Sequence, residues 1–262
     1  MTLLVVEHVS KSFGGVHAVE DVSFGLNAGE MLALIGPNGA GKSTLFNMIH
    51  GQLRPDHGSI RLRDQELIGC STRGIWQLGV GRTFQVAQTF SSLTVLENIQ
   101  MALLSHERKV FSFLRTAKDQ YRGRAMALLE QVDMTDQADR ACFELAYGDA
   151  KRVELAIALS NDPGLLLMDE PTAGMASRER SELMVLTRRL ANERNIAVLF
   201  TEHSMDVVFA HADRMIVLAR GRLIAQGSPE DVRNDPLVRE VYLGAGSIGG
   251  LHPPNLQASH HA

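Results

Sequence analysis

The stretch that decides the fold is Met31–Thr44, MLALIGPNGAGKST. Its first five residues, Met31–Ile35, are all apolar, as expected of a short strand buried on both faces. A glycine-rich turn over residues 36–41 follows, and Lys42–His50 then has helical patterning that ends at Gly51. A buried strand that passes through such a turn into a helix is the setting in which a glycine-rich loop binds phosphate.

The turn fits the phosphate-loop pattern G-x-x-x-x-G-K-[ST]. Its residues are Gly36, Pro37, Asn38, Gly39, Ala40, Gly41, Lys42, Ser43 and Thr44. Glycines let successive N–H groups point at one phosphate, and the helix N-terminus adds positive potential. We expect Lys42 to reach the β- and γ-phosphates and Ser43 to ligate Mg²⁺. The full pattern in this context disfavours an ordinary strand-to-helix turn, but GTPases, kinases, motors and transporters all share it.

Further apolar runs predict the rest of a parallel sheet. They are strand-sized, bounded by turn or cap residues and separated by helical patterning such as Arg178–Asn192. These runs are Leu165–Met168, Ile196–Phe200 and Met215–Ala219. We therefore predict an α/β fold with a buried parallel sheet covered by helices.

The flanking segments differ from this core. Leu4–Phe13 and Val16–Leu26 partly alternate between apolar and polar residues, which is typical of an antiparallel sheet with one solvated face, and Ser59–Arg63 is a candidate further strand. Residues 87–150 are mostly polar with helical patterning and show no buried strand. They predict a helical subdomain inserted into the core.

The C-terminal part predicts a hairpin, a helix and a tail. Arg220-Gly221 is expected to join two short strands, and a last helix to run over Pro229–Tyr242. Residues 246–262 are rich in Gly, Pro, His and Ser and are expected to be disordered, which leaves one domain over residues 1–245.

Composition excludes several classes of protein. The 26 Lys and Arg residues against 30 Asp and Glu leave a net charge of −4, which argues against nucleic acid as a main partner. Only two cysteines, Cys70 and Cys142, occur, so a disulfide framework or a zinc site is disfavoured. Glu7 interrupts the N-terminal apolar run, and no run approaches the roughly 20 residues of a membrane span. We expect a soluble chain that meets a membrane only through a partner.

Two carboxylates follow the run Leu165–Met168. Asp169, at the end of a predicted buried strand, is expected to hold Mg²⁺ directly or through water. Glu170, the next residue, is expected to accept a proton from the attacking water. An acidic surface turn is the alternative interpretation, and the phosphate loop upstream favours the functional one.

Two polar residues are weaker candidates. His203 follows the run Ile196–Phe200 and is placed to contact the γ-phosphate, although a histidine there can equally begin a helix. Gln85, in the segment GRTFQ, is a candidate contact to Mg²⁺ or its waters, and a polar hinge residue is the alternative.

Taken in order, these elements resemble the ATP-binding subunits of ABC transporters over residues 3–244. The family's signature segment is matched by Leu145, Ala146, Tyr147, Gly148 and Asp149. The resemblance implies a P-loop ATPase with a RecA-like core, ATP and Mg²⁺ as cofactors, and adenine stacked on Phe13. It also implies an ATP-sandwich dimer, in which the signature segment of one subunit caps the ATP held by the other.

Finer matches are similar to the high-affinity branched-chain amino acid importer group. They include IGPNGAGKSTLFNMIHG, GVGRTFQ, LAYGDAKRVELA, DEPTAGM and VREVYLG. The resemblance implies permease subunits as partners, a solute-binding protein as an indirect one, and peripheral attachment at the cytoplasmic face of the inner membrane. Phe84, Phe90 and Leu93 are expected to lie near the permease contact. The dimer partner is either a second copy or a related ATPase subunit, and the cargo is not encoded in this chain.

Two positions depart from the wider family, and other functions stay open. Ala146 stands where the signature usually has Ser, and Ala176 where an Asp is usual, with Ser177 as a substitute. The alternatives are an ABC ATPase of another system such as lipid export, a soluble ABC ATPase acting on ribosomes or DNA, a P-loop kinase, and a structural protein without catalysis. The signature segment argues against the kinase.

Overall fold

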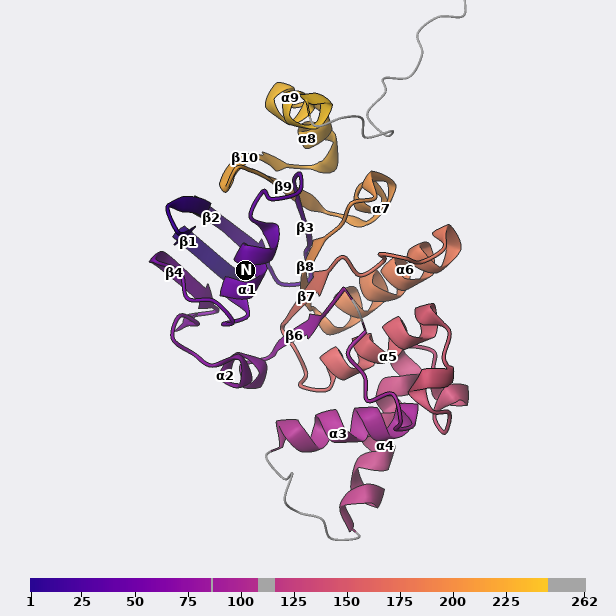
Figure 1. Cartoon of the computed structure of the whole chain (residues 1–262). Helices are drawn as coiled ribbons and strands as arrows, with labels where there is room; N and C mark the ends of the chain where they lie inside the picture. Colours follow the sequence, from indigo (N-terminus) through magenta and orange to yellow (C-terminus); the bar gives the residue numbers. More distant parts are fainter. Residues whose placement is uncertain (86, 108–115, 245–262) are drawn as a thin grey trace, which may run out of the picture.

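The structure, a computed structural model, describes residues 1–85, 87–107 and 116–244, and these form two sheets with helices around them (Figure 1). The four-stranded sheet has the order β2-β1-β4-β5, and the six-stranded sheet has the order β10-β9-β3-β8-β7-β6. The strands of the first are β1 (Thr2–Phe13), β2 (Val16–Asn27), β4 (His57–Leu62) and β5 (Gln65–Glu66). Those of the second are β3 (Met31–Ile35), β6 (Val80–Thr83), β7 (Leu165–Asp169), β8 (Ala197–Thr201), β9 (Arg214–Ala219) and β10 (Arg222–Gly227).

The predicted parallel sheet is confirmed. β3 pairs in parallel with both β8 and β9, and β7 pairs in parallel with β8. Within this sheet, the sequence did not predict β6, which pairs in parallel with β7. Its residues Gly81 and Arg82 break the apolar pattern. A Cβ at Gly81 would lie 2.5 Å from the carbonyl oxygen of Ala158, so glycine is what lets a neighbouring helix pack on this strand.

The antiparallel sheet is also confirmed. β1 pairs antiparallel with β2 on one side and with β4 on the other, so the segment at Ser59–Arg63 does add a strand. The turn at Arg220-Gly221 joins β9 to β10, with both residues at positive φ.

The period-two alternation of β3 separates two hydrophobic cores. Met31, Ala33 and Ile35 belong to the core shared with the helices, whereas Leu32 and Leu34 belong to the core shared with the antiparallel sheet. All five are buried to 1% exposure or less. A strand buried on both faces needs apolar residues at every position, which explains its unbroken apolar sequence.

The helices account for most of the remaining chain. They are α1 (Lys42–Ile49), α2 (Thr72–Gln77), α3 (Val95–His106), α4 (Thr116–Gln131), α5 (Tyr147–Leu159), α6 (Ser177–Arg194), α7 (Met205–His211), α8 (Pro229–Asn234) and α9 (Pro236–Gly244). α1 packs between the two sheets through Leu45, Phe46 and Ile49. None of the helices in the described part of the chain is both long and apolar enough to cross a membrane.

Helices α3, α4 and α5 gather at the end of the molecule away from the antiparallel sheet (Figure 1). Thr94 caps α3 and exchanges hydrogen bonds with Glu97, which is the capping box expected at a helix start. Among the described residues of 87–150, helices and short 3₁₀ turns occur and no named strand. The assignment of this region as a separate subdomain, and the boundary at 245, stay predictions.

The last helix was predicted wrongly. In place of one helix over Pro229–Tyr242, α8 ends at Asn234 and α9 begins at Pro236. Asp235 between them has an extended backbone, which a residue before proline prefers, and the proline ring has no N–H to continue the ladder. The predicted tail, 246–262, lies outside the described residues.

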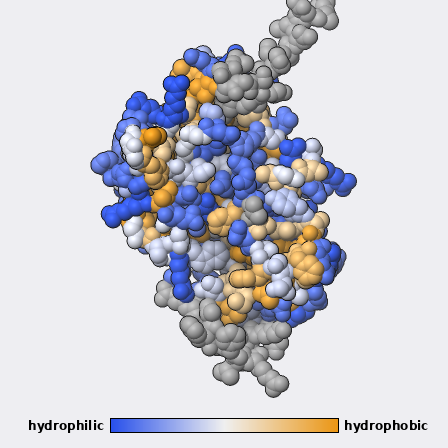
Figure 2. Space-filling model, viewed as in Figure 1, coloured by the Kyte–Doolittle hydropathy of each residue, from blue (hydrophilic) through white to orange (hydrophobic). Residues whose placement is uncertain are grey.

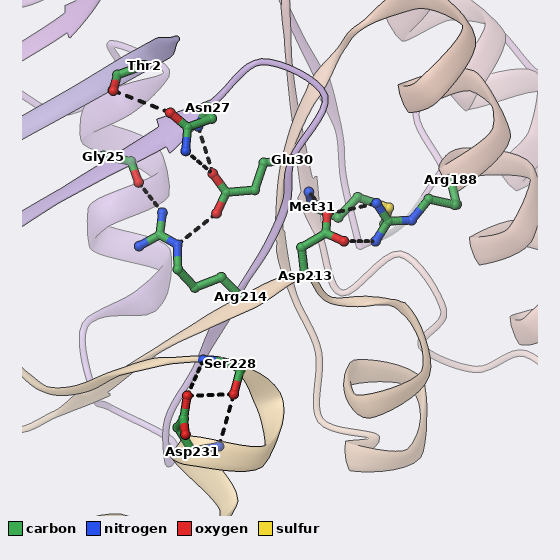
Figure 3. A network of polar contacts seen from close by, with 10 residues as sticks. All are labelled: Thr2, Gly25, Asn27, Glu30, Met31, Arg188, Asp213, Arg214, Ser228 and Asp231. Carbon is green, nitrogen blue, oxygen red and sulfur yellow. Dashed lines mark hydrogen bonds and ion pairs between the residues drawn. The ribbon is translucent and has the colours of Figure 1, made fainter.

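A polar network joins the two sheets at the start of β3 (Figure 3). Nε of Arg214 in β9 donates to Glu30 at 2.7 Å, and Glu30 accepts from the backbone N–H of Asn27 at 2.8 Å. Arg214 also donates to the carbonyl of Gly25. These contacts tie the end of β2 to the parallel sheet.

A second part of this network holds the first residue of β3. Asp213 accepts from the backbone N–H of Met31 at 2.8 Å, and both of its oxygens accept from Arg188 of α6, at 2.7 and 3.0 Å. The strand that leads into the phosphate loop is therefore anchored at its start by side chains from α6 and from the residue before β9 (Figure 3).

Candidate active site

The loop from β3 to α1 has a backbone that only glycine adopts easily at two points. Gly36 and Gly41 have φ of 155° and 105°. A Cβ at Gly36 would lie 2.2 Å from the carbonyl oxygen of Leu218, and one at Gly41 would lie 2.3 Å from that of Ala18. The loop is thus packed against β9 and β2, and its glycines are required by both conformation and space.

The loop borders a pocket of about 210 Å³. The pocket is lined by Ala18, Asn38, Gly39, Ala40, Gly41, Lys42, Ser43, Thr44 and Glu170. Residues from the predicted phosphate loop and the predicted general base therefore face one space. Ser43 is exposed there, whereas Lys42 is 8% exposed.

The Lys42 ammonium lies within the curl of the loop. Its Nζ donates to the carbonyl of Gly36 at 2.7 Å and to that of Pro37 at 3.1 Å. Burial lowers the pKa of Lys42, and the negative charges of Glu170 and Asp169 oppose this effect. A cation held at the loop with two carboxylates close by can stabilise the charge of a bound triphosphate.

Thr201 orients the carboxylate pair. Asp169 ends β7 and is paired with Thr201, which ends β8. The Thr201 hydroxyl donates to Oδ1 of Asp169 at 2.9 Å and accepts from the backbone N–H of Glu170 at 2.9 Å. Glu170 has φ of 48°, a left-handed conformation that is costly for a side chain other than glycine. The hydrogen bond from the Glu170 N–H to the Thr201 hydroxyl is one of the contacts that hold the backbone in this conformation.

The two oxygens of Glu170 each meet another predicted residue. Oε1 lies 2.7 Å from Nε2 of His203, and Oε2 accepts from Nε2 of Gln85 at 2.9 Å. His203, Glu170 and Gln85 follow the neighbouring strands β8, β7 and β6, so the sheet order brings them to one edge. A carboxylate held at both oxygens beside the phosphate-loop pocket is oriented to accept a proton from water. The roles of the three residues stay predictions.

Arg82 is a site residue that sequence reasoning missed. Its Nη2 lies 3.6 Å from Oδ2 of Asp169 and donates to Asn47 of α1 at 3.0 Å. The guanidinium also lies 4.9 Å from the ring centroid of Phe84, which is half-buried. Burial and the charge of Arg82 lower the pKa of the nearby His50 to about 4, so His50 is neutral at pH 7. Arg82 lies in β6, which the sequence did not predict.

The signature segment lies at the start of α5. Ala146 is the residue before the first turn and supplies no side-chain cap, as its departure from the family pattern implies. The Tyr147 hydroxyl donates to the carbonyl of Gln85 at 3.0 Å. Of the described residues, those that line the phosphate-loop pocket include none from Leu145–Asp149. Within one chain the segment contacts the Gln85 backbone, and its predicted capping of a second subunit's ATP stays a prediction.

Two further predicted residues lie apart from the pocket. Phe13 ends β1, is 47% exposed, and has the Lys11 ammonium 5.6 Å from its ring centroid. It is not among the described residues that line the pocket, so its contact with adenine stays a prediction. Ala176 precedes α6, and Ser177 accepts from Arg180 at 3.0 Å.

The residues predicted to bind Mg²⁺ are hard oxygen donors. They are the hydroxyl of Ser43, the carboxylate of Asp169 and the side-chain amide of Gln85. Mg²⁺ is commonly held by one or two such groups and completes its shell with phosphate and water, so the donor set fits. In the described ranges, no group of three or more His, Cys, Asp and Glu side chains is placed to hold a metal.

Comparison with known proteins decides the family. A family model described as "ABC transporter" matches residues 19–173. The chain is 40% identical over 250 residues to the high-affinity branched-chain amino acid transport ATP-binding protein LivG of Escherichia coli strain K12, covering 92% of this chain and 98% of the relative. The chain belongs to the ABC transporter family. It is also 36% identical to BraF of Pseudomonas aeruginosa, a high-affinity branched-chain amino acid transport ATP-binding protein, with the same coverage.

Solved ABC cassettes agree with the fold. A nucleotide-free ATP-binding cassette from an ABC transporter matches with a TM-score of 0.83 and 31% identity, over 92% of this chain and 99% of that one. The predicted P-loop ABC ATPase fold is thereby confirmed, and so is the predicted activity: the chain is an ATP-binding, ATP-hydrolysing subunit of an ABC transporter. A second family model, "Branched-chain amino acid ATP-binding cassette transporter", matches residues 222–247.

Proposed function

We propose that this ABC ATPase energises the uptake of branched-chain amino acids or chemically related small organic molecules. Two relatives named for branched-chain amino acid transport cover nearly the whole chain, and the C-terminal segment 222–247 matches a family of the same name. The observation that carries the catalytic part is the contact of Glu170 with both His203 and Gln85 beside the phosphate-loop pocket.

The residues divide the work of hydrolysis. The amides of residues 36–44 and the Lys42 ammonium bind the phosphates and spread their developing charge. Glu170 orients the attacking water and takes its proton, while His203 and Gln85 hold the carboxylate in place. Mg²⁺, held by Ser43 and Asp169 with Gln85 beside it, supplies charge neutralisation at the phosphates when bound. Thr201 and Arg82 keep Asp169 in position.

The working unit is a dimer in which ATP lies between two subunits. Leu145–Asp149 of one subunit caps the ATP bound by Gly36–Thr44 of the other, and hydrolysis removes the bridging γ-phosphate. The location of the signature segment supports this arrangement. Within one chain, Tyr147 of the segment contacts the backbone of Gln85, and none of the described residues that line the phosphate-loop pocket comes from the segment. The partner is a second copy or a related ATPase subunit.

The permease contact is proposed at a groove beside α3. This groove, of about 370 Å³, is lined by Trp76, Gln88, Phe90, Asn98, Met101, Ala102, Ser105 and Ile157. Phe90 is 61% exposed, which supports its predicted place at the interface, whereas Phe84 packs against Arg82. Figure 2 shows apolar residues in small groups on a largely hydrophilic face, several of them over the helical part at the lower right. The subunit would thus sit peripherally on the cytoplasmic face of the inner membrane.

Uptake in cells tests the cargo. A strain that lacks this gene should take up labelled leucine, isoleucine or valine more slowly, and the wild-type gene should restore uptake while a Lys42→Ala gene should not. If the wild-type gene, but not the Lys42→Ala gene, restored uptake of a different solute, the energising role would be supported and the proposed cargo would be contradicted. Restoration by Lys42→Ala would contradict the proposed energising role.

A further inference from the structure

A buried ion pair on α5 forms hydrogen bonds with the backbone of Phe84, the residue before Gln85. Lys151 and Glu154 have side chains that are 2% and 3% exposed and lie 3.1 Å apart. Oε1 of Glu154 accepts from the backbone N–H of Phe84 at 2.8 Å, and the Lys151 ammonium donates to the carbonyl of the same residue. The backbone N–H of Gln88 also donates to Glu154. The pair thus binds the backbone on both sides of Gln85, at Phe84 and at Gln88.

A third residue on the same face of α5 binds the backbone of the next residue. Tyr147 donates to the carbonyl of Gln85 at 3.0 Å. Tyr147, Lys151 and Glu154 are spaced by four and three residues, which places them on one side of a helix. They hold the backbone of two consecutive residues, Phe84 and Gln85, and the side chain of Gln85 donates to Glu170.

The position of Phe84 explains why charged side chains are used. β6 ends at Thr83, which is paired with Met168 of β7, so the ladder stops one residue before Phe84. A buried backbone N–H and carbonyl need other partners at that point. Glu154 supplies an acceptor for the N–H, and Lys151 supplies a donor for the carbonyl. A buried ion pair by itself is weak evidence for stability, because apolar residues often fill the same volume equally well. What apolar residues cannot do is bind both polar groups of Phe84.

We propose that Tyr147, Lys151 and Glu154 are positioning residues, which hold the backbone of Phe84 and Gln85 so that the Gln85 amide reaches Glu170. The proposal rests on the proposed roles of Glu170 and Gln85 in hydrolysis. It has a consequence for the dimer. Because α5 begins with the signature segment, the helix that caps the ATP of one site also sets the geometry of Glu170 in its own chain.

Steady-state kinetics in two backgrounds test the proposal. Glu154→Gln and Tyr147→Phe should each lower kcat about tenfold, since misplacing a catalytic group by about 1 Å costs on the order of 100-fold. For Glu154→Gln, which lies outside both the phosphate loop and the signature segment, the affinity for a fluorescent ATP analogue should change less than about twofold. In a Gln85→Ala background, either substitution should slow hydrolysis by less than about twofold, since coupled residues are not additive.

Matched controls separate positioning from stability. Tyr121→Phe removes a hydroxyl that donates to Glu107 elsewhere among the helices, and Glu182→Gln breaks the exposed pair with Arg178 at 2.7 Å. Both should keep the kcat of wild type. The double substitution Lys151→Met with Glu154→Met fills the buried volume without stranding a charge. It should lower the thermal transition, because the N–H and the carbonyl of Phe84 lose their partners. It should still lose kcat when assayed at a temperature where circular dichroism shows it folded, so it tests the proposal even if Glu154→Gln fails to fold.

Equal slowing in the Gln85→Ala and wild-type backgrounds would overturn the proposal and leave the ATPase assignment intact. A double-methionine variant with the kcat of wild type would also overturn it. Hydrolysis at the wild-type rate by the single variant Gln85→Ala would instead contradict the proposed role of Gln85. Hydrolysis at the wild-type rate by Lys42→Ala would contradict the assignment of the phosphate-loop pocket as the ATP site.

Discussion

The hydroxyl of Thr201 donates to Oδ1 of Asp169 at 2.9 Å, and the two residues are paired at the ends of neighbouring strands. The same hydroxyl accepts from the backbone N–H of Glu170. One side chain of β8 therefore orients both the carboxylate predicted to hold Mg²⁺ and the backbone that aims the predicted base.

Thr201→Val tests this relationship with little change of shape. The variant loses one donor and one acceptor, and it leaves a part-buried N–H unpaired, which costs about 1–3 kcal/mol of stability. We expect a lower kcat and a higher Mg²⁺ concentration at half-maximal activity, measured by titrating Mg²⁺ in an ATPase assay. Thr187→Val is the matched control, because that buried hydroxyl donates only within α6, to Leu183. An unchanged Mg²⁺ requirement in Thr201→Val would refute the role in positioning Asp169.

Lys42→Ala should lose ATP binding, turnover or both. The ammonium lies within the phosphate loop, and no other side chain among the described pocket residues carries a positive charge. Equilibrium binding of a fluorescent ATP analogue and phosphate release are the measurements, with circular dichroism to show that the fold persists. Arg61→Ala, which breaks the surface pair with Glu7, should behave as wild type. Ordinary turnover in Lys42→Ala would remove the central assignment.

Glu170→Gln should bind ATP, hydrolyse it far more slowly and accumulate as a dimer. The amide keeps the size of the carboxylate but cannot take a proton from water. Gel filtration with saturating ATP and Mg²⁺ should show the dimer, and gel filtration without ATP should show its loss. A variant that stays monomeric with ATP would contradict the sandwich arrangement, and hydrolysis at the wild-type rate would contradict the role as base.

His50 should make the fold less stable below pH 6.5. Its pKa is about 4 in the folded chain against 6.5 for an ordinary histidine, so between these values the unfolded chain binds more protons. Stability is complete above pH 6.5 and falls as the pH drops towards 4, by at most about 3 kcal/mol. Denaturant unfolding at pH 7 and pH 5 measures it. His50→Gln should lose less stability between the two pH values than wild type, and an equal loss would show that another group is responsible.

Sequence patterns predicted a strand that is apolar at every position. They missed β6, in which contacts with other elements of the fold determine the residue types. Met31–Ile35 was predicted correctly because a strand buried on both faces is apolar throughout. β6 was missed because Gly81 and Arg82 are in it for reasons of contact, one admitting α5 and the other pairing with Asp169. The break at Asp235 had a local signal, the following Pro236, which the prediction of one long helix overlooked.

The amino-acid sequence by itself determined the phosphate loop and the family of this protein. A strand, a glycine turn and a helix start lie next to one another in the chain, and their conformations are set by local sterics and apolar periodicity. Only the tertiary structure decided which of ten histidines meets Glu170, that Gln85 meets its other oxygen, and that Thr201 and Arg82 hold Asp169. These residues are far apart in sequence, and they converge because the order β6-β7-β8 places the ends of three strands at one edge. Strand order depends on long-range packing, which no local pattern records.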